Sequence, residues 1–495
     1  MARLRQLAAG GVAVEEEPLP GGLAGQLRPY QLAGYNWLVF VWRHRLGGIL
    51  ADDMGLGKTL QVLALIARAR QAADGAGGVA ASEPFLVVAP SSVVPGWLEE
   101  AARFTPGLVV RAATSTRARD GVEMSSLRDG ADAVVTTYAL FRLDNAEFAA
   151  HRWAGLILDE AQFAKNFAAQ ANQLARALGT PFKLAMTGTP LENSLDELWA
   201  IYGIVAPGLL GGRKRFSQLY GNALKQGGQP GAEALARLRR RIKPLLMRRT
   251  KELVAPELPE RQEQLFHVKL APKHRKLYDT YLQRERSRML GLMEDYEANR
   301  FAIFRSLTTL RRAALDVSLV DPDIAGVPSS KLDVLMDQLD QVVRAGHRAL
   351  VFSQFTTYLA KARQRLEAAG VDYAYLDGAT TKRADVIGGF KRGTAPVFLI
   401  SLKAGGFGLN LTEADYVFLL DPWWNPATEN QAIDRTHRIG QSRPVMVTRL
   451  VAEQTIEDKV MALKQKKQAL FDSVLDQDGG FGAGLTAEDV RALVE

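Results

Sequence analysis

Short apolar runs that end in polar residues recur along the first part of the chain. They read GGILAD, FLVVAPSS, DAVVTTY, GLILDEAQ and KLAMTGTP. Runs that are apolar throughout are typical of strands buried on both faces of a parallel sheet. Stretches with helical patterning, such as residues 58–69, separate them. The alternation predicts a doubly wound α/β lobe whose functional residues follow the carboxyl ends of its strands.

A second set of apolar runs follows the middle of the chain: ALVFSQF, YAYLDG, VFLISLKAGG, YVFLLDPWW and VMVTRLV. Between the two sets, residues 208–320 are rich in charge and poor in β-branched side chains, which favours helices. We therefore expect an α/β fold of two parallel-sheet lobes with helical insertions between them. The expected segments are a tail (1–24), lobe 1 (25–207), a helical protrusion that ends lobe 1 (208–262), a helical insertion and linker (263–330), lobe 2 (331–455) and C-terminal bracing helices (456–495).

Composition narrows the class of protein. The chain has 495 residues, of which 47% are hydrophobic and 23% charged, enough to bury several cores. No apolar run approaches the ~18 residues of a membrane span, and the N-terminal sequence lacks a signal peptide's apolar segment, so we expect a cytoplasmic protein. The absence of cysteine excludes disulfides and thiolate metal sites. A net charge of +8 favours a polyanionic partner such as nucleic acid.

The abrupt change of chemistry in ADDMGLGKT, residues 51–59, predicts a phosphate-binding turn. An apolar strand stops, the backbone turns through Gly55 and Gly57, and Lys58 and Thr59 open a helix whose free N–H groups face the turn. Lys58 would reach the β and γ phosphates of a nucleotide, and the Thr59 hydroxyl would bind magnesium. The match is to a variant of the common pattern, because Asp52 stands where that pattern has glycine.

The run GLILDEAQ places two adjacent carboxylates, Asp159 and Glu160, at the end of a strand. One carboxylate would bind magnesium, and the other would lie beside the attacking water. Adjacent acids on a surface loop are usually only solvated. The apolar strand that precedes this pair favours a site instead.

Arg435 and Arg438 are three residues apart, so on one helix face their guanidiniums could reach one ligand. Such a pair is a candidate arginine finger, which stabilises charge in the transition state of phosphoryl transfer. The phosphate turn and the two acids belong to the first lobe and the arginines to the second. Hydrolysis would then require the lobes to close, and each turnover would open and close the cleft.

These motifs, in this order, resemble those of the Swi/Snf family of ATP-dependent DNA translocases, within helicase superfamily two. The resemblance covers nearly all of the chain from Leu27 onward. Its most specific parts are SLKAGGFGLNLTEAD and QAIDRTHRIGQ, and the others are LRPYQLAGYNWL, DDMGLGKT, VVAPSSVVPGW, TTYAL, DEAQFAKN, MTGTPLEN and VFSQF. The resemblance implies two RecA-like lobes and the ligands ATP and Mg²⁺.

The resemblance also implies roles for single residues. Catalysis would use Lys58, Glu160, Arg435 and Arg438, and Thr59 and Asp159 would hold the metal. ATP binding would use Gln31, as the amide that reads the base, with Asp53, Met54, Gly55, Leu56, Gly57, Lys58, Thr59 and Leu60. Contacts to the DNA backbone would come from Ser91, Ser92, Thr136, Thr137, Thr187, Ser353, Gln354, Ser401, Lys403 and Trp424. Coupling of the ATP and DNA sites would use Gln162, Thr189 and Gln431.

Three motifs depart from the family pattern. Gln162 stands where many members have histidine, which alters coupling but leaves the carboxylates intact. Leu402 and Lys403 replace a threonine and an arginine, so a hydroxyl and a forked donor are lost and a weaker grip on DNA is expected. Asp53 replaces glutamate, with little expected effect.

Other features have more than one reading. Trp423 and Trp424 could lie near DNA or pack in a core. His437 is interpreted as a structural hydrogen-bonding residue, since no second histidine at ligand spacing accompanies it. A basic run could bind phosphates, form a solvated helix face or form salt bridges between the lobes; it comprises Arg237, Arg239, Arg240, Arg241, Lys243, Arg248 and Arg249.

We therefore expect a DNA-stimulated ATPase that moves along double-stranded DNA without reading its sequence and remodels protein–DNA complexes. Two alternatives remain open: a strand-separating helicase of the same superfamily, and a nucleotide-gated clamp that binds DNA or RNA polymerase with little turnover. The expected partners are duplex DNA and the proteins bound to it, RNA polymerase among them, and the expected state is a monomer at the bacterial nucleoid. The motor is expected to be complete, and bacterial relatives suggest a further N-terminal region outside this chain.

Overall fold

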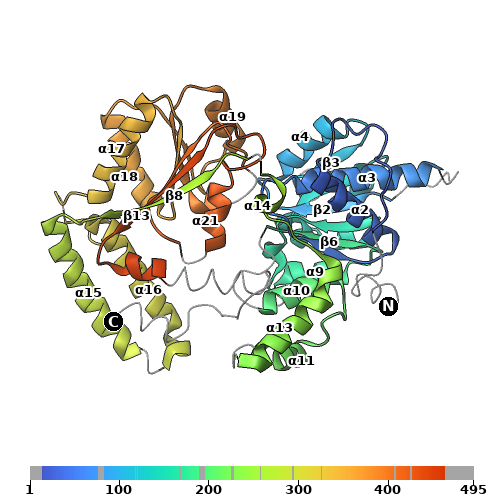
Figure 1. The fold of residues 1–495 in the computed structure, drawn as a ribbon, viewed down its shortest axis with the longest axis horizontal. Helices are drawn as coiled ribbons and strands as arrows, with labels where there is room; N and C mark the ends of the chain where they lie inside the picture. The colour runs from blue at the N-terminus through green and yellow to red at the C-terminus, as the bar shows by residue number, and fades with distance from the viewer. Residues whose placement is uncertain are drawn as a thin grey trace. The chain divides into compact units, whose positions relative to one another are not determined.

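The computed structural model describes residues 14–75, 83–116, 119, 121–166, 169–188, 195–223, 228–256, 258–292, 295–324, 326–405, 409–423 and 426–462. The described chain divides into two compact units, one ending at residue 256 and the other beginning after it (Figure 1). Within these ranges, no helix is long and apolar enough to cross a membrane.

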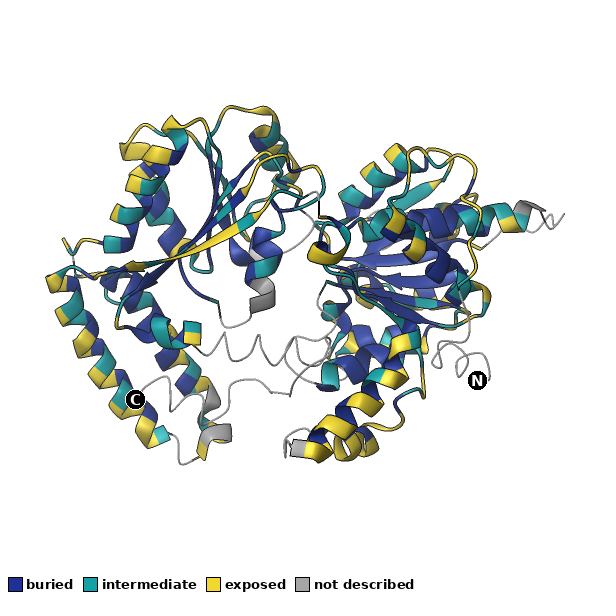
Figure 2. Ribbon diagram, in the orientation of Figure 1, coloured by how far each residue is buried: buried dark blue, intermediate teal, exposed yellow. Residues whose placement is uncertain are grey.

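The first unit is built on a parallel sheet with the strand order β3-β4-β2-β5-β6-β1-β7. Its inner strands are buried on both faces, which is why their sequences are apolar throughout (Figure 2). The strands are β1 (Gly48–Leu50), β2 (Phe85–Ala89), β3 (Val110–Ala113), β4 (Ala133–Thr137), β5 (Gly155–Leu158), β6 (Lys183–Met186) and β7 (Leu246–Met247).

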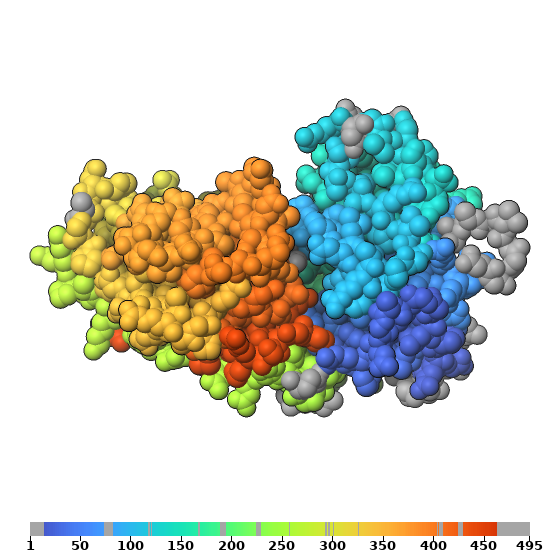
Figure 3. Space-filling view, turned by 90° about the horizontal axis from the view of Figure 1, so that it is seen from above, coloured from blue at the N-terminus to red at the C-terminus, as the bar shows by residue number. Residues whose placement is uncertain are grey.

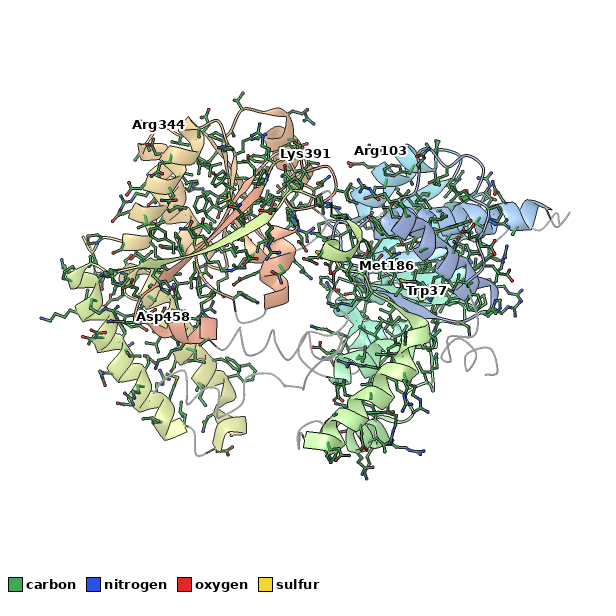
Figure 4. All side chains as sticks on the ribbon, viewed as in Figure 1. Trp37, Arg103, Met186, Arg344, Lys391 and Asp458 are labelled. Atoms are coloured by element: carbon green, nitrogen blue, oxygen red, sulfur yellow. The ribbon has the colours of Figure 1, made fainter. Side chains whose placement is uncertain are left out.

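Helices cover this sheet and extend beyond it. Trp37 of α2 packs so closely on the sheet that a Cβ atom at Gly48 would lie 2.8 Å from its ring, and Trp37 and Met186 of β6 are labelled within this unit in Figure 4. Residues 14–28 and α2 form part of the surface drawn dark blue in Figure 3. The helices are α2 (Pro29–Arg43), α3 (Lys58–Gly75), α4 (Val94–Phe104), α6 (Met124–Arg128), α7 (Tyr138–Leu143), α8 (Asn145–Ala150), η1 (Ala161–Ala164), α9 (Gln170–Ala177), α10 (Leu195–Val205), α11 (Arg213–Phe216), η2 (Ser217–Asn222), α13 (Gly228–Ile242), η3 (Lys243–Leu245) and α14 (Lys251–Val254).

The second unit is built on another parallel sheet, with the order β10-β11-β9-β12-β13-β8. Separate apolar clusters pack on it, and another cluster joins α15 and α16 to the end of β13. Its strands are β8 (Arg261–Val268), β9 (Ala349–Ser353), β10 (Tyr373–Leu376), β11 (Val397–Ser401), β12 (Tyr416–Leu419) and β13 (Val445–Ala452). Its helices are α15 (Pro272–Leu292), α16 (Tyr296–Leu315), η5 (Val317–Leu319), α17 (Ser330–Arg344), α18 (Thr356–Ala368), α19 (Arg383–Arg392), α20 (Leu402–Gly405) and α21 (Pro426–Ile433).

A buried ion pair ties the start of α17 to the residues after β13. Nζ of Lys331 donates to a carboxylate oxygen of Glu457 and, over 2.8 Å, to the carbonyl oxygen of Leu420. The same Glu457 oxygen accepts from the backbone N–H of Ala452 over 2.8 Å. Burial raises the pKa of Glu457, and the Lys331 ammonium opposes that shift. The pair therefore fixes the end of this sheet from inside the unit.

The predicted fold of two parallel-sheet α/β lobes is confirmed, and each of the ten apolar runs quoted above contains a strand. The expectation of helices throughout residues 208–320 is wrong at β7 and β8. β8 is an edge strand that is exposed along most of its length, so it lacks the apolar signature of the inner strands (Figure 2). The expected segment boundaries stay predictions.

Candidate active site

The turn after β1 takes its shape from two glycines and a helix start. Gly55 and Gly57 have φ angles of 86° and 76°, in the left-handed region that favours glycine. At Gly57 a Cβ atom would also lie 2.5 Å from Nε2 of Gln31. α3 begins directly afterwards at Lys58, so its unpaired N–H groups and the positive end of its dipole face the turn. This is the local geometry of an anion-binding turn.

The start of α2 is hydrogen-bonded to the same turn. Oη of Tyr30, at 3.0 Å, and Nε2 of Gln31, at 3.2 Å, both donate to the carbonyl oxygen of Leu56. Burial raises the pKa of Tyr30 to about 12, so this hydroxyl keeps its proton and stays a donor. Gln31 is thereby placed beside the turn, where its role in reading the base stays a prediction.

Lys58 is held inside the turn. Its Nζ donates to the carbonyl oxygens of Asp52, over 2.6 Å, and Asp53, over 3.2 Å. The Asp53 carboxylate, which sequence resemblance assigns to ATP binding, accepts from the backbone N–H of Lys251 over 3.0 Å. It therefore ties the turn to the start of α14. Of the other expected ATP-binding residues, Met54 and Leu56 are buried, and Thr59 and Leu60 are half-buried in the first turn of α3.

Asp159 follows β5 and is almost fully buried. Its Oδ2 accepts from Nε1 of Trp97 over 2.8 Å, its Oδ1 accepts from the N–H of Glu160 over 2.9 Å, and its carbonyl oxygen accepts from Oη of Tyr138 over 2.9 Å. Burial and the adjacent Glu160 carboxylate raise the pKa of Asp159 to about 7, while Trp97 and the Lys58 ammonium oppose the shift. The buried carboxylate of Asp159 is suited to binding a cation, and the nearby Lys58 ammonium is suited to binding the phosphates that share that cation.

Glu160 is the residue with the most unusual backbone in this region. Its φ of 48° and ψ of 56° lie in the left-handed region, which a non-glycine residue rarely adopts. Nε2 of Gln162 donates to Oε2 of Glu160 over 2.9 Å, and Oε1 of Gln162 accepts from Oγ1 of Thr187 over 2.8 Å. A hydrogen-bonded link through Gln162 thus joins Thr187, the residue after β6, to the Glu160 carboxylate after β5.

The strand order brings these groups to one edge of the sheet. β5, β6 and β1 are neighbours and run parallel, so their carboxyl ends lie together. The loop after β6 also touches the phosphate turn, because a Cβ atom at Gly188 would lie 3.1 Å from Cγ of Met54. The turn, the acidic pair and the Thr187 link therefore belong to one site.

The oxygen groups at this edge fit a magnesium ion. A carboxylate from Asp159 and a hydroxyl from Thr59 are hard oxygen ligands, and Mg²⁺ commonly takes few protein ligands and completes its shell with phosphate and water. The described residues contain no cluster of three or more histidine, aspartate or glutamate side chains that could hold a metal. Asp159 and Thr59 would therefore hold the ion together with the nucleotide.

The second unit presents the two expected arginines differently from the sequence prediction. α21 ends at Ile433, and Arg435 and Arg438 lie on the turns that follow it, so the prediction of one helical face is wrong. Their guanidiniums nevertheless converge: Nη1 of each donates to the carbonyl oxygen of Leu409 over 3.3 Å. Arg435 is buried and Arg438 is half-buried.

Four hydroxyls expected at DNA have partners inside the fold, and their contacts to DNA stay predictions. All four side chains are buried. Their partners are the Ala113 carbonyl for Thr136, Gln162 for Thr187, the Asp421 carboxylate for Ser353, and the Ala404 N–H for Ser401.

The remaining DNA and coupling candidates are placed unevenly. Ser91 is exposed, and Ser92 and Gln354 are half-buried. Thr137 caps α7 by accepting from Leu140 over 3.1 Å, and Gln431 lies buried in α21. Thr189, Trp424 and the side chain of Lys403 lie outside the described residues.

Sequence reasoning missed several supporting residues. Trp97 and Tyr138 stand at the ends of the VVAPSSVVPGW and TTY stretches, so their positions in those motifs were the available signal. His437, interpreted as structural, has Nε2 at 3.0 Å from the Pro259 carbonyl oxygen. Trp423 is half-buried, and its backbone N–H donates to Oε1 of Glu429 over 2.7 Å.

The chain is similar to known proteins over nearly all of its length. Residues 30–319 match the model of the SNF2-related domain, and residues 330–440 match the helicase conserved C-terminal domain. YwqA of Bacillus subtilis, which carries the name of an ATP-dependent helicase/translocase, is 32% identical over 96% of this chain and 51% of its own length. The ISWI chromatin-remodeling complex ATPase ISW1 of Saccharomyces cerevisiae is 31% identical over 93% of this chain and 41% of its own length.

A solved structure of the Sulfolobus solfataricus SWI2/SNF2 ATPase core in complex with dsDNA is 29% identical. It covers 97% of this chain and 99% of that one, with a TM-score of 0.46.

The fold and site define a helicase-like ATPase with two parallel-sheet lobes. The chain belongs to the SNF2 family, because the SNF2-related domain model matches more than half of it. It spans about half the length of the curated relatives it matches.

Proposed function

We propose that this chain couples ATP hydrolysis to movement along double-stranded DNA and so remodels protein–DNA complexes. The observation that carries the proposal is the hydrogen-bonded link from Thr187 through Gln162 to Glu160, beside the phosphate turn. It connects the carboxylate expected to activate water to the loop after β6. Such a link can transmit a change at that loop to the hydrolytic site.

The chain's own residues divide the chemistry between them. The N–H groups that open α3 and the Lys58 ammonium bind the phosphates. Glu160 accepts a proton from the attacking water, and Gln162 orients its carboxylate. Asp159 and Thr59 would hold a magnesium ion, which would supply positive charge beside the phosphates.

Movement on DNA is supported by the family and by charge. The relatives above carry the names of an ATP-dependent helicase/translocase and of the ATPase of a chromatin-remodeling complex. A net charge of +8 suits a polyanion, and Ser91 presents an exposed hydroxyl after β2. Contacts of this kind bind phosphate without reading bases, as movement along any sequence requires.

The test is steady-state ATP hydrolysis with magnesium, in the presence of no nucleic acid, duplex DNA, single-stranded DNA or duplex RNA. Glu160→Gln serves as the blank. Strong stimulation by duplex DNA alone, followed by displacement of a triplex-forming strand, supports the proposal. Stimulation mainly by single strands or RNA contradicts it and favours a strand-separating helicase, and absence of turnover contradicts it and favours a nucleotide-gated clamp.

The other parts of the proposal stay predictions. They are the action of Arg435 and Arg438 on the nucleotide, a monomeric state, binding to RNA polymerase or other DNA-bound proteins, and a location at the nucleoid. The rate effect of Arg435→Ala tests the first of them.

A further inference from the structure

Arg249 lies between β7 and α14, in a basic run for which the sequence left open whether the charges meet phosphate, solvent or the other lobe. The structure gives it an internal partner. Nε of Arg249 donates to Oδ1 of Asp52 over 2.9 Å, and Nη2 donates to Oδ2 of the same carboxylate. The Arg249 side chain is 12% exposed and that of Asp52 is fully buried. The ion pair is therefore bidentate and shielded from water.

The same guanidinium also bonds two helices that flank the phosphate turn. Nη1 donates to the carbonyl oxygen of Tyr30 in α2, and Nη2 donates to Oε1 of Gln61 in α3 over 2.9 Å. Nε2 of Gln61 lies 3.3 Å from both Oδ2 of Asp52 and the carbonyl oxygen of Gly57. Arg249 thus joins the start of α2, the strand end and the first turns of α3.

The backbone on either side of Arg249 follows the phosphate turn as well. β7 pairs with β1 in the register Leu50↔Met247. The pairing continues past the strands. The backbone N–H of Ala51 donates to the carbonyl oxygen of Met247 over 2.6 Å, and the backbone N–H of Asp53 donates to the carbonyl oxygen of Arg249 over 3.0 Å. The entry to the turn is therefore hydrogen-bonded along one side to residues 247–249.

A glycine in α2 leaves room for this arrangement. A Cβ atom at Gly34 would lie 1.9 Å from Oε1 of Gln61 and 2.6 Å from Nη2 of Arg249. Any side chain at this position would separate α2 from the two groups. The close approach is thus built into the helix that also carries Tyr30 and Gln31.

We propose that Arg249 is a positioning residue for nucleotide binding. It neutralises the buried Asp52 carboxylate and holds α2, the phosphate turn and α3 in one arrangement, so that Lys58 and the first N–H groups of α3 are set for phosphate. The inference rests on the proposed function only in that the turn binds ATP. To the residues of the turn itself, the inference adds Arg249, which lies 197 positions after Asp52 in the sequence.

The reason for a large effect is the buried charge. Without Arg249, Asp52 keeps only the Gln61 amide as a side-chain partner in the hydrogen bonds described above. A buried carboxylate that loses its cation is strongly destabilised. The chain around Asp52 must then move so that the carboxylate reaches water, and Lys58, which donates to the Asp52 carbonyl, moves with it.

The test measures the Kd of a fluorescent ATP analogue in the absence of DNA, together with KM and kcat of basal hydrolysis. Arg249→Met should raise Kd and KM by about tenfold or more, with a smaller change in kcat. Arg249→Lys keeps the charge but not the fork, so its Kd should lie between those of Arg249→Met and the wild type. The exposed Arg103 of α4, labelled in Figure 4, provides the control Arg103→Met, whose Kd should equal the wild-type value.

A double variant that loses both charges separates the effect of the unpaired carboxylate from general misfolding. Asp52→Asn with Arg249→Met removes the buried unpaired carboxylate, so its Kd should be closer to the wild-type value than that of Arg249→Met alone. Wild-type Kd and KM in Arg249→Met overturn the inference, as does a proportional loss of kcat alone. Failure of duplex DNA to stimulate the wild-type ATPase overturns the proposed function and leaves this inference standing.

Discussion

Gln162 holds the Glu160 carboxylate through a hydrogen bond of 2.9 Å from its amide nitrogen to Oε2. The other end of the amide accepts from Thr187 over 2.8 Å. A glutamine can serve this position because its planar amide carries a donating NH₂ group on one side and an accepting oxygen on the other. Gln162 therefore connects Thr187, the residue after β6, to the Glu160 carboxylate.

Glu160→Gln should leave ATP binding within about threefold of the wild-type Kd and lower kcat by about 10² or more, since a general base contributes roughly 10² to 10⁴ in rate. The amide keeps the shape of the side chain but cannot take the proton from water. Fluorescent-analogue binding and phosphate release measure the two effects. Hydrolysis at the wild-type rate would remove Glu160 from this role.

Gln162→Ala and Thr187→Val cut the same link at different places. Each should lower kcat by about threefold to tenfold with little change in KM, because a single oriented hydrogen bond is worth about 1 kcal/mol. Their double variant should lose no more than Gln162→Ala alone, since the link is already broken. Additive losses in kcat across this cycle would show that the two residues act separately.

Arg435→Ala should lower the DNA-stimulated ATPase rate by about 10³ or more if the residue stabilises the transition state. Arg435 is buried and bonds the Leu409 carbonyl, so thermal unfolding of the variant must be measured beside its activity. Arg438→Ala, which removes the other guanidinium on that carbonyl, is the matched comparison. A loss below tenfold in a folded Arg435→Ala variant would exclude the arginine-finger role.

His274 should make the second unit less stable in acid. Burial lowers its pKa from the ordinary 6.5, although the hydrogen bond to the Ala313 carbonyl and the charge of Asp316 oppose this. Nε2 lies 2.7 Å from that carbonyl oxygen, so Nε2 carries the proton of the neutral ring. Nδ1 is buried and has no hydrogen-bond partner within the described chain, so the ring resists a second proton.

The direction of the pH dependence of stability follows from the number of protons that the folded and unfolded chains bind. Below pH 6.5 the unfolded chain binds a proton at this histidine that the folded chain does not, so the free energy of unfolding falls as pH falls. The contribution can reach about 1.4 kcal/mol per pH unit. Urea unfolding at pH 7.5 and 5.5 should show a smaller acid loss for His274→Gln than for the wild type, and equal losses would contradict the prediction.

The inner strands were predictable because burial on both faces requires apolar residues throughout, as in GGILAD and GLILDEAQ. The phosphate turn was predictable because the φ angles of Gly55 and Gly57 favour glycine. β8 was missed because an exposed edge strand needs no such pattern. The arginine pair was placed on a helix because a spacing of three suits a helix, whereas two turns after α21 bring both guanidiniums to one carbonyl oxygen.

The sequence by itself determined two parallel-sheet lobes, the phosphate turn and the identity of the acidic pair, since each depends on residues that are neighbours along the chain. Only the tertiary structure decided which hydroxyls are used internally and which cation neutralises Asp52. These depend on strand order and on contacts between distant segments, such as the pairing of Asp52 with Arg249, which local periodicity does not encode. A motif can therefore be recognised from neighbouring residues, whereas the hydrogen bonds that position it come from segments far apart in the sequence.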